Sequence, residues 1–135
     1  MTKPRLKQAM ADKAWENLEA AERLLEGTAP CTNASTSRAY YAAYQACWAA
    51  MVSAGHSVPT LAAGAYFPHK TLPTLAEDAS VLDDLRAEDL RLLEGRRVKA
   101  DYFEDRVSEA EADDSHVIAK ELVSGLLPDV GEVNR

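Results

Sequence analysis

The chain has 135 residues, of which 47% are hydrophobic and 27% charged, a composition that fits one folded domain and argues against wholesale disorder. Its 15 basic and 22 acidic residues give a formal net charge of −7, which excludes a coat on duplex nucleic acid held by bulk positive charge. The two cysteines lack metal-ligand spacing, and glycine and proline interrupt the longest uncharged run, so we expect a cytoplasmic protein without a disulfide framework or a membrane span.

The first helix is predicted over residues 4–26. Pro4 stands at its start and Gly27 just past its end, which is the order that helices prefer. Its apolar residues recur every three to four positions and form one stripe: Leu6, Met10, Ala14, Leu18, Ala21 and Leu25. Charged residues of both signs occupy the opposite face, so this segment is predicted to be an amphipathic helix.

The second helix is predicted over residues 35–54, with Ser35 or Asn33 as its N-terminal cap and Gly55 at its end. No charged residue occurs between positions 39 and 52, so most of the helix circumference is expected to be buried. Its many alanines would let neighbouring helices approach closely, while its tyrosines and tryptophan fill the remaining volume. We expect this helix to lie at the centre of the fold.

The middle of the chain is less regular. Residues 55–72 show no sustained apolar period, and a short helix is predicted over residues 73–79. The next long helix begins near Ser80 and reaches Arg106. A kink or local loosening is expected at Gly95, because a glycine inside a helix costs about 1 kcal/mol relative to alanine.

The last helix begins at a capping-box signature formed by Ser108 and Glu111, and Pro128 ends it. The tail from 129 to 135 is expected to fray. No segment shows the alternating pattern of a strand for more than a few residues. The fold class is therefore predicted to be all-α, an antiparallel up-and-down bundle of four long helices plus one short helix, with residues 1–135 in a single domain.

The familiar signatures of catalysis and metal binding do not occur in the sequence, which has no Gly-rich phosphate loop, GxSxG, HExxH or paired ExxH. His56, His69 and His116 are too scattered to indicate a metal site. The acidic clusters fit solvated helix faces. We expect no metal and no cofactor, and the roles of His69 and His116 stay open.

Residues 37–44, with the sequence SRAYYAAY, form the first candidate site. Arg38 is the only charged residue near the start of an otherwise apolar helix, and a buried arginine needs a partner or an exit to solvent. Helical spacing places it on one face with Tyr41 and Tyr44. Two interpretations are open, an arginine that reaches solvent at the end of the bundle while the tyrosines pack, or a binding site.

Residues 96–102, with the sequence RRVKADY, hold the only concentrated positive charge of the acidic chain. Arg97 and Asp101 are four residues apart and can pair along a helix. Here also two interpretations are open. One is a surface ion-pair patch, which stabilises the fold little. The other is an anion site, in which arginine offers a planar fork of donors to a phosphate.

Four segments in this order on a helical framework, SRAYYAAYQA, PHKTL, RRVKADY and HVIAKELV, resemble the HEPN superfamily. The similarity extends from the first helix to about Leu127, and it is to a branch of small prokaryotic proteins with R-A-Y-Y-A and R-x-x-A-D-Y helices, often encoded beside a minimal nucleotidyltransferase. The resemblance implies an up-and-down bundle that usually dimerises. It also implies a toxin–antitoxin, defence or CRISPR setting, in which many members are metal-independent ribonucleases.

The resemblance further implies a catalytic motif in which a histidine follows an arginine after four to six residues. The arginine stabilises the charged transition state, and the histidine moves the proton of the attacking 2′-hydroxyl. Residues 98–103, after Arg97, contain no histidine, and His116 lies ten residues beyond Arg106. Asp101 beside Arg97 would be a weak base. We therefore expect binding rather than catalysis and assign no catalytic residue.

The leading hypothesis is a HEPN-type module that forms a homodimer, has a nucleotidyltransferase as a possible partner and binds nucleotide or RNA phosphate. The candidate binding residues are Arg38, Tyr41, Arg97, Asp101 and Tyr102. One alternative is a metal-independent endoribonuclease with a non-standard acid/base set. The other is a non-catalytic structural or antitoxin-like partner in which most of these side chains form a buried polar network.

Overall fold

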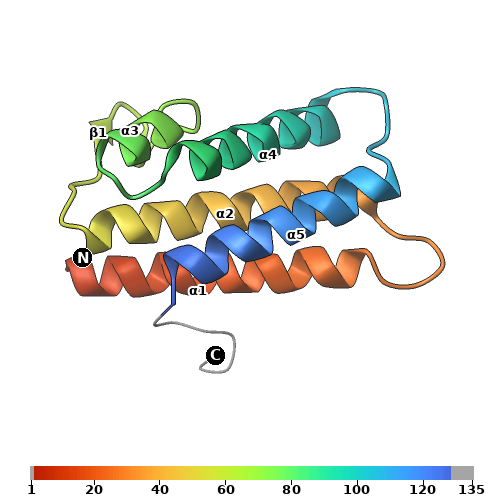
Figure 1. Ribbon diagram of the computed structural model, residues 1–135, viewed down its shortest axis with the longest axis horizontal. Coiled ribbons are helices and arrows are strands. Elements are labelled where there is room, and N and C mark those ends of the chain that lie inside the picture. Colours follow the sequence, from red (N-terminus) through yellow and green to blue (C-terminus); the bar gives the residue numbers. More distant parts are fainter. Residues whose placement is uncertain (1, 129–135) are drawn as a thin grey trace.

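The computed structural model describes residues 2–128, which form five helices and one small hairpin. The elements are α1 (Lys3–Leu24), α2 (Thr32–Ser53), β1 (Thr60–Leu61), β2 (Gly64–Ala65), α3 (Leu72–Asp78), α4 (Asp84–Tyr102) and α5 (Glu109–Leu126). The four long helices lie alongside one another, and α3 and the hairpin lie at one end of the bundle (Figure 1). The predicted all-α bundle of four long helices and one short helix is confirmed. None of the helices within residues 2–128 combines the length and apolarity needed to cross a membrane.

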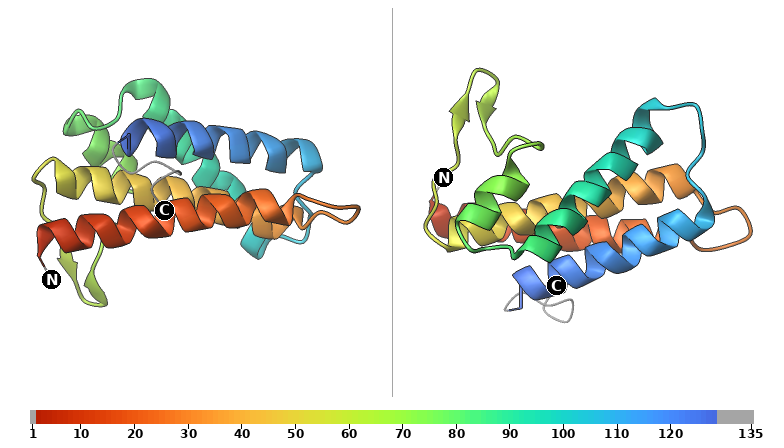
Figure 2. Two further views of the ribbon diagram at one scale, coloured as in Figure 1. Left: turned by 90° about the horizontal axis from the view of Figure 1, so that it is seen from below. Right: turned by 45° about the horizontal axis from the view of Figure 1, so that its top comes forward.

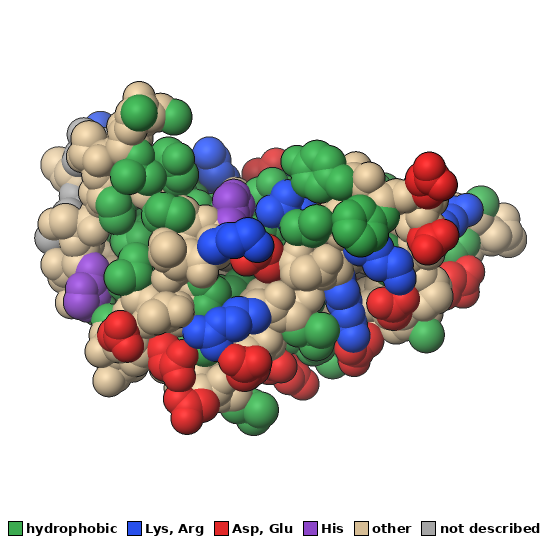
Figure 3. Space-filling model, turned by 90° about the horizontal axis from the view of Figure 1, so that it is seen from above, with side chains coloured by type: hydrophobic (Ala, Val, Ile, Leu, Met, Phe, Trp, Pro, Cys, Tyr) green, Lys and Arg blue, Asp and Glu red, His purple; other side chains and the backbone are tan. Residues whose placement is uncertain are grey.

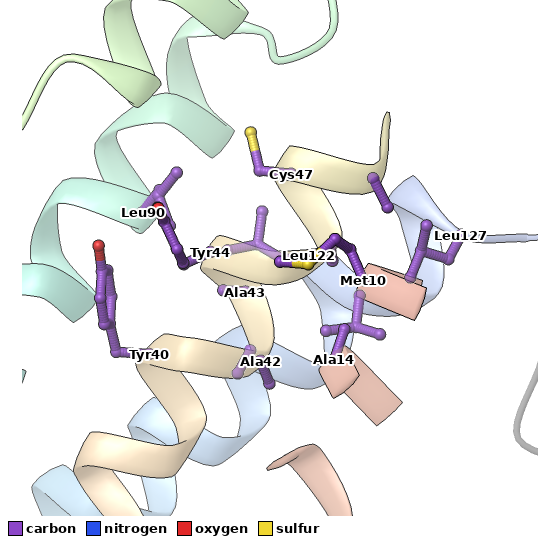
Figure 4. Close-up of a cluster of buried hydrophobic side chains, with 14 of the residues drawn as sticks. Met10, Ala14, Tyr40, Ala42, Ala43, Tyr44, Cys47, Leu90, Leu122 and Leu127 are labelled. Carbon is purple, nitrogen blue, oxygen red and sulfur yellow. The ribbon is translucent and has the colours of Figure 1, made fainter. Parts of the chain in front are cut away.

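Helix α2 packs against α1, α4 and α5 and is the centre of the bundle, as predicted (Figure 2). Figure 4 shows Met10 of α1, Leu90 of α4 and Leu122 of α5 around its middle turns. The alanines of α2 at 39, 42, 43, 46 and 49 are fully buried. Because alanine has a small side chain, the three surrounding helices can pack closely against α2 at once.

Helix α2 begins at Thr32, three residues before the predicted start, and no side chain caps it. The Ser35 hydroxyl donates a hydrogen bond to the Ala21 carbonyl of α1 at 2.7 Å. The Asn33 side-chain oxygen accepts one from the Val107 amide at 2.8 Å. The predicted caps are therefore wrong, because both side chains bind other parts of the fold.

Helix α4 is shorter at both ends than the predicted span of residues 80–106. Asp83 caps its start by accepting a hydrogen bond from the Arg86 amide at 2.8 Å, and Phe103 is extended and ends it. The helix is continuous through Gly95, as predicted. Arg106 lies in the following loop, where its guanidinium donates to the Pro30 carbonyl at 2.9 Å.

The remaining boundaries agree closely with the predictions. Helix α3 spans residues 72–78, one residue earlier than predicted at each end. Ser108 caps α5 by accepting a hydrogen bond from the Glu111 amide at 3.1 Å, which confirms the predicted start of this helix. The hairpin was not predicted. Each of its strands has only two residues, all of them exposed, and this is too short to show an alternating pattern. The tail that was expected to fray, residues 129–135, lies outside the described residues.

Candidate functional site

Arg97 is the buried charge around which the candidate site forms. It lies on α4, and its side chain is 10% exposed. Its guanidinium carbon is 5.3 Å from the ring centroid of Tyr40 and 5.8 Å from that of Tyr41, both on α2. Contacts of an arginine with an aromatic face contribute about 0.5–2 kcal/mol each and orient the guanidinium. Aromatic rings, rather than hydrogen bonds, therefore hold Arg97 in place.

The hydrogen-bonding capacity of Arg97 is unused among residues 2–128. Its Nε atom is buried and has no hydrogen-bond partner there. Its closest charged atom is an Asp101 carboxylate oxygen 3.7 Å from Nη1, which is an ion pair too long to be a hydrogen bond. The same oxygen accepts a hydrogen bond from the Ser37 hydroxyl of α2 at 3.4 Å. Asp101 thus balances the charge of Arg97 without taking its donors.

His69 reaches the same aromatic cluster from the loop between β2 and α3. Its ring stacks on Tyr44 with centroids 4.3 Å apart, and its centroid lies 5.5 Å from that of Tyr40 and 5.9 Å from that of Tyr41. The Tyr40 hydroxyl and His69 Nδ1 are hydrogen bonded at 2.6 Å. Arg97 and His69 therefore contact the same two tyrosine rings, although they are far apart in the sequence.

The surroundings of His69 favour its neutral form. Burial lowers the pKa of His69 below its usual value and the Arg97 charge lowers it further, while Glu94 acts in the opposite direction. With Nδ1 engaged by Tyr40, Nε2 has no hydrogen-bond partner in the described part of the chain. A neutral imidazole with one free ring nitrogen can bind a polar ligand or move a proton.

Charge on this side of the molecule is mixed but locally positive. Glu94 is buried on α4, and its carboxylate lies 3.4 Å from the ammonium group of the exposed Lys70. On the face formed by α3 and α4, basic side chains gather around a histidine near the middle. Most acidic side chains on this face lie toward one long edge and one end (Figure 3). A small anion would therefore meet positive charge there, despite the acidity of the whole chain.

Two of the predicted site residues lie apart from the others. Arg38 is exposed and donates a hydrogen bond to the Asn17 side-chain oxygen of α1 at 3.0 Å. Tyr102 is 74% exposed and follows Arg97 by five residues, which places it about 140° around α4. The structure brings together Tyr41, Arg97 and Asp101. The buried network of both arginines, Asp101 and Tyr102 does not form.

His69 is the one residue of the cluster that lies in the PHKTL segment, which contributed to the family resemblance. The spacing between PHKTL and RRVKADY in the sequence does not show that these two segments lie close together in the fold. His116, the other histidine of open role, lies on α5, and its buried Nε2 has no hydrogen-bond partner within residues 2–128. No group of three or more His, Cys, Asp or Glu residues within 2–128 could hold a metal ion.

Comparison with models of known protein families matches the HEPN domain over residues 8–127. No curated protein matches the chain. The matched range runs from the second turn of α1 to the end of α5, so it includes every residue of the Arg97–His69 cluster.

Proposed function

The chain belongs to the HEPN domain family, and from that premise we propose that it binds RNA or nucleotide phosphate at the cluster of Arg97, His69 and Tyr41. The observation that carries the proposal is the state of Arg97. Two tyrosine rings orient its guanidinium, and no hydrogen bond joins it to another residue of the described chain. An oriented arginine with free donors is suited to a phosphate group.

The surroundings of Arg97 strengthen this interaction. Because the side chain is mostly removed from water, its attraction to an anion is screened less than that of an exposed arginine. The neutral His69 ring and the half-buried Tyr41 lie beside it and can contact the sugar or the base. The net charge of −7 restricts binding to such a local site, which fits a single-stranded segment or a nucleotide better than a long duplex.

The test is a titration of a labelled single-stranded RNA oligonucleotide at low salt, followed by fluorescence anisotropy. Arg97→Gln is expected to weaken binding by about tenfold or more, because charge-assisted hydrogen bonds contribute about 1.5–3 kcal/mol. Arg97→Lys should retain part of the affinity for RNA, because lysine keeps the positive charge but lacks the planar fork of hydrogen-bond donors of arginine.

The matched control is Arg23→Gln, which removes one positive charge from an exposed ion pair with Glu19 on α1. It should leave RNA binding within about twofold of the unchanged protein. Circular dichroism verifies that each variant is folded. Equal affinity in the Arg97→Gln and Arg23→Gln proteins would refute the proposed site.

A second candidate function is RNA cleavage without a metal, and the observation that favours it is His69. His69 contacts the same tyrosine ring as Arg97, so it supplies near Arg97 the histidine that residues 98–103 lack. His69 would take the proton of a 2′-hydroxyl, whose oxygen attacks the adjacent phosphorus while Arg97 stabilises the added charge. The bond to the 5′-oxygen breaks and that oxygen receives the proton, which yields a 2′,3′-cyclic phosphate and a 5′-hydroxyl.

Incubation of the protein with the same RNA and a chelator distinguishes RNA binding from RNA cleavage. Cleavage that survives the chelator and disappears in His69→Gln, while RNA binding is weakened by a much smaller factor, identifies a ribonuclease. Intact RNA in the presence of normal binding identifies a binding module.

The proposed biological setting is a toxin–antitoxin-like or defence system in the cytoplasm, with a nucleotidyltransferase as partner. Its support is the resemblance of the α2 segment SRAYYAAYQA and the α4 segment RRVKADY. A purely structural role has less support, because Arg38 and Tyr102 do not join Arg97 in a buried network.

A further inference from the structure

One turn of α2 and one turn of α4 place four side chains opposite one another. Ser37 precedes Tyr41 by four residues on α2, and Arg97 precedes Asp101 by four on α4. Residues at this spacing lie on one face of a helix, about 6 Å apart along its axis. The Arg97 guanidinium carbon is 5.8 Å from the Tyr41 ring centroid, and the Ser37 hydroxyl is 3.4 Å from an Asp101 carboxylate oxygen. A cationic and an anionic group therefore lie next to each other between the two helices.

The Asp101 carboxylate uses little of its hydrogen-bonding capacity within the chain. An ionised carboxylate has two oxygens with about four acceptor positions and no donor. Among residues 2–128, its hydrogen bond comes from Ser37, and the Arg97 guanidinium stays 3.7 Å away. The Asp101 side chain is 31% exposed, so a ligand can reach it. Ser37 and Arg97 thus hold the carboxylate in place, and its other acceptor positions are left for water or a ligand.

A carboxylate beside an anion site discriminates among ligands. Asp101 repels a phosphate bound at Arg97, because like charges then lie close together in a partly buried site. A ligand that brings only acceptor oxygens meets this repulsion in full. A ligand that also brings hydrogen-bond donors to the carboxylate offsets it, because hydrogen bonds to a charged group are stronger than those between neutral groups. Asp101 therefore favours an anion that carries donors near its phosphate.

Among the four RNA bases, guanine has the donors that match a carboxylate. Its Watson–Crick edge carries two neighbouring donors, N1–H and the 2-amino group, which fit the two carboxylate oxygens. Adenine and cytosine each place one donor beside a ring nitrogen that accepts, and uracil has one donor between two carbonyl oxygens. In those three bases an acceptor would face the second carboxylate oxygen and be repelled by it.

We propose that Asp101 selects a guanine base whose phosphate is bound at Arg97, in single-stranded RNA or in a free nucleotide. This inference rests on the proposed function, because the phosphate contact at Arg97 brings the base to Asp101. One nucleotide can contact both side chains, since its phosphate and its base are joined through opposite sides of the sugar. The half-buried Tyr41 ring beside Arg97 provides an aromatic surface for the base. Ser37 is a positioning residue, which orients the carboxylate.

The test compares short labelled RNAs that differ at a single base. Uridine oligonucleotides with guanosine, adenosine, cytidine or inosine at the central position are titrated at low salt, and fluorescence anisotropy reports binding. The guanosine RNA is expected to bind about tenfold more tightly than the adenosine and cytidine RNAs, because a bidentate contact discriminates against the wrong base to this extent. The inosine RNA should have an intermediate affinity, because inosine keeps N1–H and lacks the 2-amino group.

Asp101→Asn removes the negative charge and replaces one acceptor oxygen with an amide that donates. The preference for guanosine over adenosine should fall to within about twofold, while the affinity for the adenosine RNA is kept or increased, because the repulsion of the phosphate is gone. A merely structural role of Asp101 would weaken the binding of all the RNAs alike.

The matched control is Asp105→Asn, which removes an equal charge from an exposed position in the loop after α4. This variant should keep the preference for guanosine. Circular dichroism verifies that both variants are folded.

Competition with unlabelled ligands distinguishes the two sources of guanine. Displacement of the labelled RNA by GMP at the concentrations at which the guanosine RNA displaces it would identify the free nucleotide as a sufficient ligand. Displacement by the guanosine RNA at much lower concentrations than by GMP would identify RNA as the ligand. In both cases AMP should displace the labelled RNA less effectively than GMP.

Two outcomes would overturn the selection of guanine and leave the proposed function intact. One is RNA binding that depends on Arg97 and is equally tight for guanosine, adenosine and cytidine. The other is a preference for guanosine that Asp101→Asn does not change, because another group would then recognise the base. Equal affinity of Arg97→Gln and Arg23→Gln, or no binding of RNA and GMP at all, would instead refute the proposed function.

Discussion

Tyr40 connects the two side chains on which the candidate site depends. Its ring lies beneath the Arg97 guanidinium, and its hydroxyl bonds the His69 ring. Burial, and after it the charge of Glu94, raises the pKa of Tyr40, so the phenol keeps its proton at any physiological pH. Because Tyr40 is 1% exposed and packed in the core, the positions of Arg97 and His69 are fixed together.

The coupling between Arg97 and His69 leads to a prediction about a single pKa. Removing the positive charge with Arg97→Gln is expected to raise the pKa of His69, because a nearby cation disfavours the imidazolium. Burial persists in the variant, so the pKa should stay below the usual value for histidine. The measurement is an NMR titration of the His69 ring protons.

Arg38→Gln is the control for that titration, because Arg38 points to Asn17 and is not among the charges that act on His69. The pKa of His69 should be the same in this variant as in the unchanged protein. An unaltered His69 titration in Arg97→Gln would contradict the proximity of the two groups.

At the scale of secondary structure, the start of α2 is tied to the loop between α4 and α5. Asn33 accepts a hydrogen bond from the Val107 amide, while Arg106 donates to the Thr32 hydroxyl at 3.3 Å and to the Pro30 carbonyl. These bonds join residues more than 70 positions apart along the chain. They explain why α4 ends at residue 102 rather than at 106, since the loop residues bind α2 instead of continuing the helix.

Asn33→Ala is expected to lower the free energy of unfolding by about 1–2 kcal/mol, because it leaves the Val107 amide without its acceptor. Asn33→Asp should cost less, since the aspartate keeps the acceptor oxygen. Urea unfolding of the three proteins measures the difference. Equal losses in both variants would show that the hydrogen bond is not what Asn33 contributes.

At the scale of the whole molecule, acidic charge is concentrated on two segments. Residues 77–94 carry seven acidic and two basic residues, and residues 104–121 carry seven acidic residues and two lysines or arginines. Burial raises the pKa of Asp89, and Glu121, Asp114 and Asp83 raise it further. The crowding of carboxylates across α4 and α5 therefore works against the folded state at neutral pH.

The sign of that effect can be tested with Asp89→Asn. A carboxyl group whose pKa is raised by folding stabilises the fold below its ordinary pKa of 3.8, and loses that contribution as the pH rises through the folded value. The variant should therefore be more stable than the unchanged protein at pH 7, by about 0.5 kcal/mol. This advantage should vanish near pH 3.

The control for Asp89→Asn is Glu16→Gln, which removes one negative charge from the exposed face of α1, where charges of both signs occur. Urea unfolding at both pH values should show no comparable gain for this variant. A gain of equal size would assign the effect to the net charge rather than to the local crowding around Asp89.

Much of the fold could be predicted from the sequence because its signals are local. The three-to-four residue spacing of apolar side chains in residues 4–26 marks a buried helix face, and the uncharged run from 39 to 52 marks a central helix. The cap formed by Ser108 depends on atoms within one turn. The predicted caps of α2 were wrong because the side chains of Asn33 and Ser35 form hydrogen bonds with residues far away in the sequence.

The candidate site could be predicted only in part from the sequence. By itself, the sequence determined the helical class, the acidic charge of the chain and the one basic segment that contains Arg97. The packing of the helices in three dimensions places His69 and Arg97 against the same tyrosine rings, and it leaves Arg38 and Tyr102 apart from Arg97. The physical reason is that helical periodicity reports which face of a helix is buried. The packing of α2, α4 and the loop before α3 determines which side chains meet on that face.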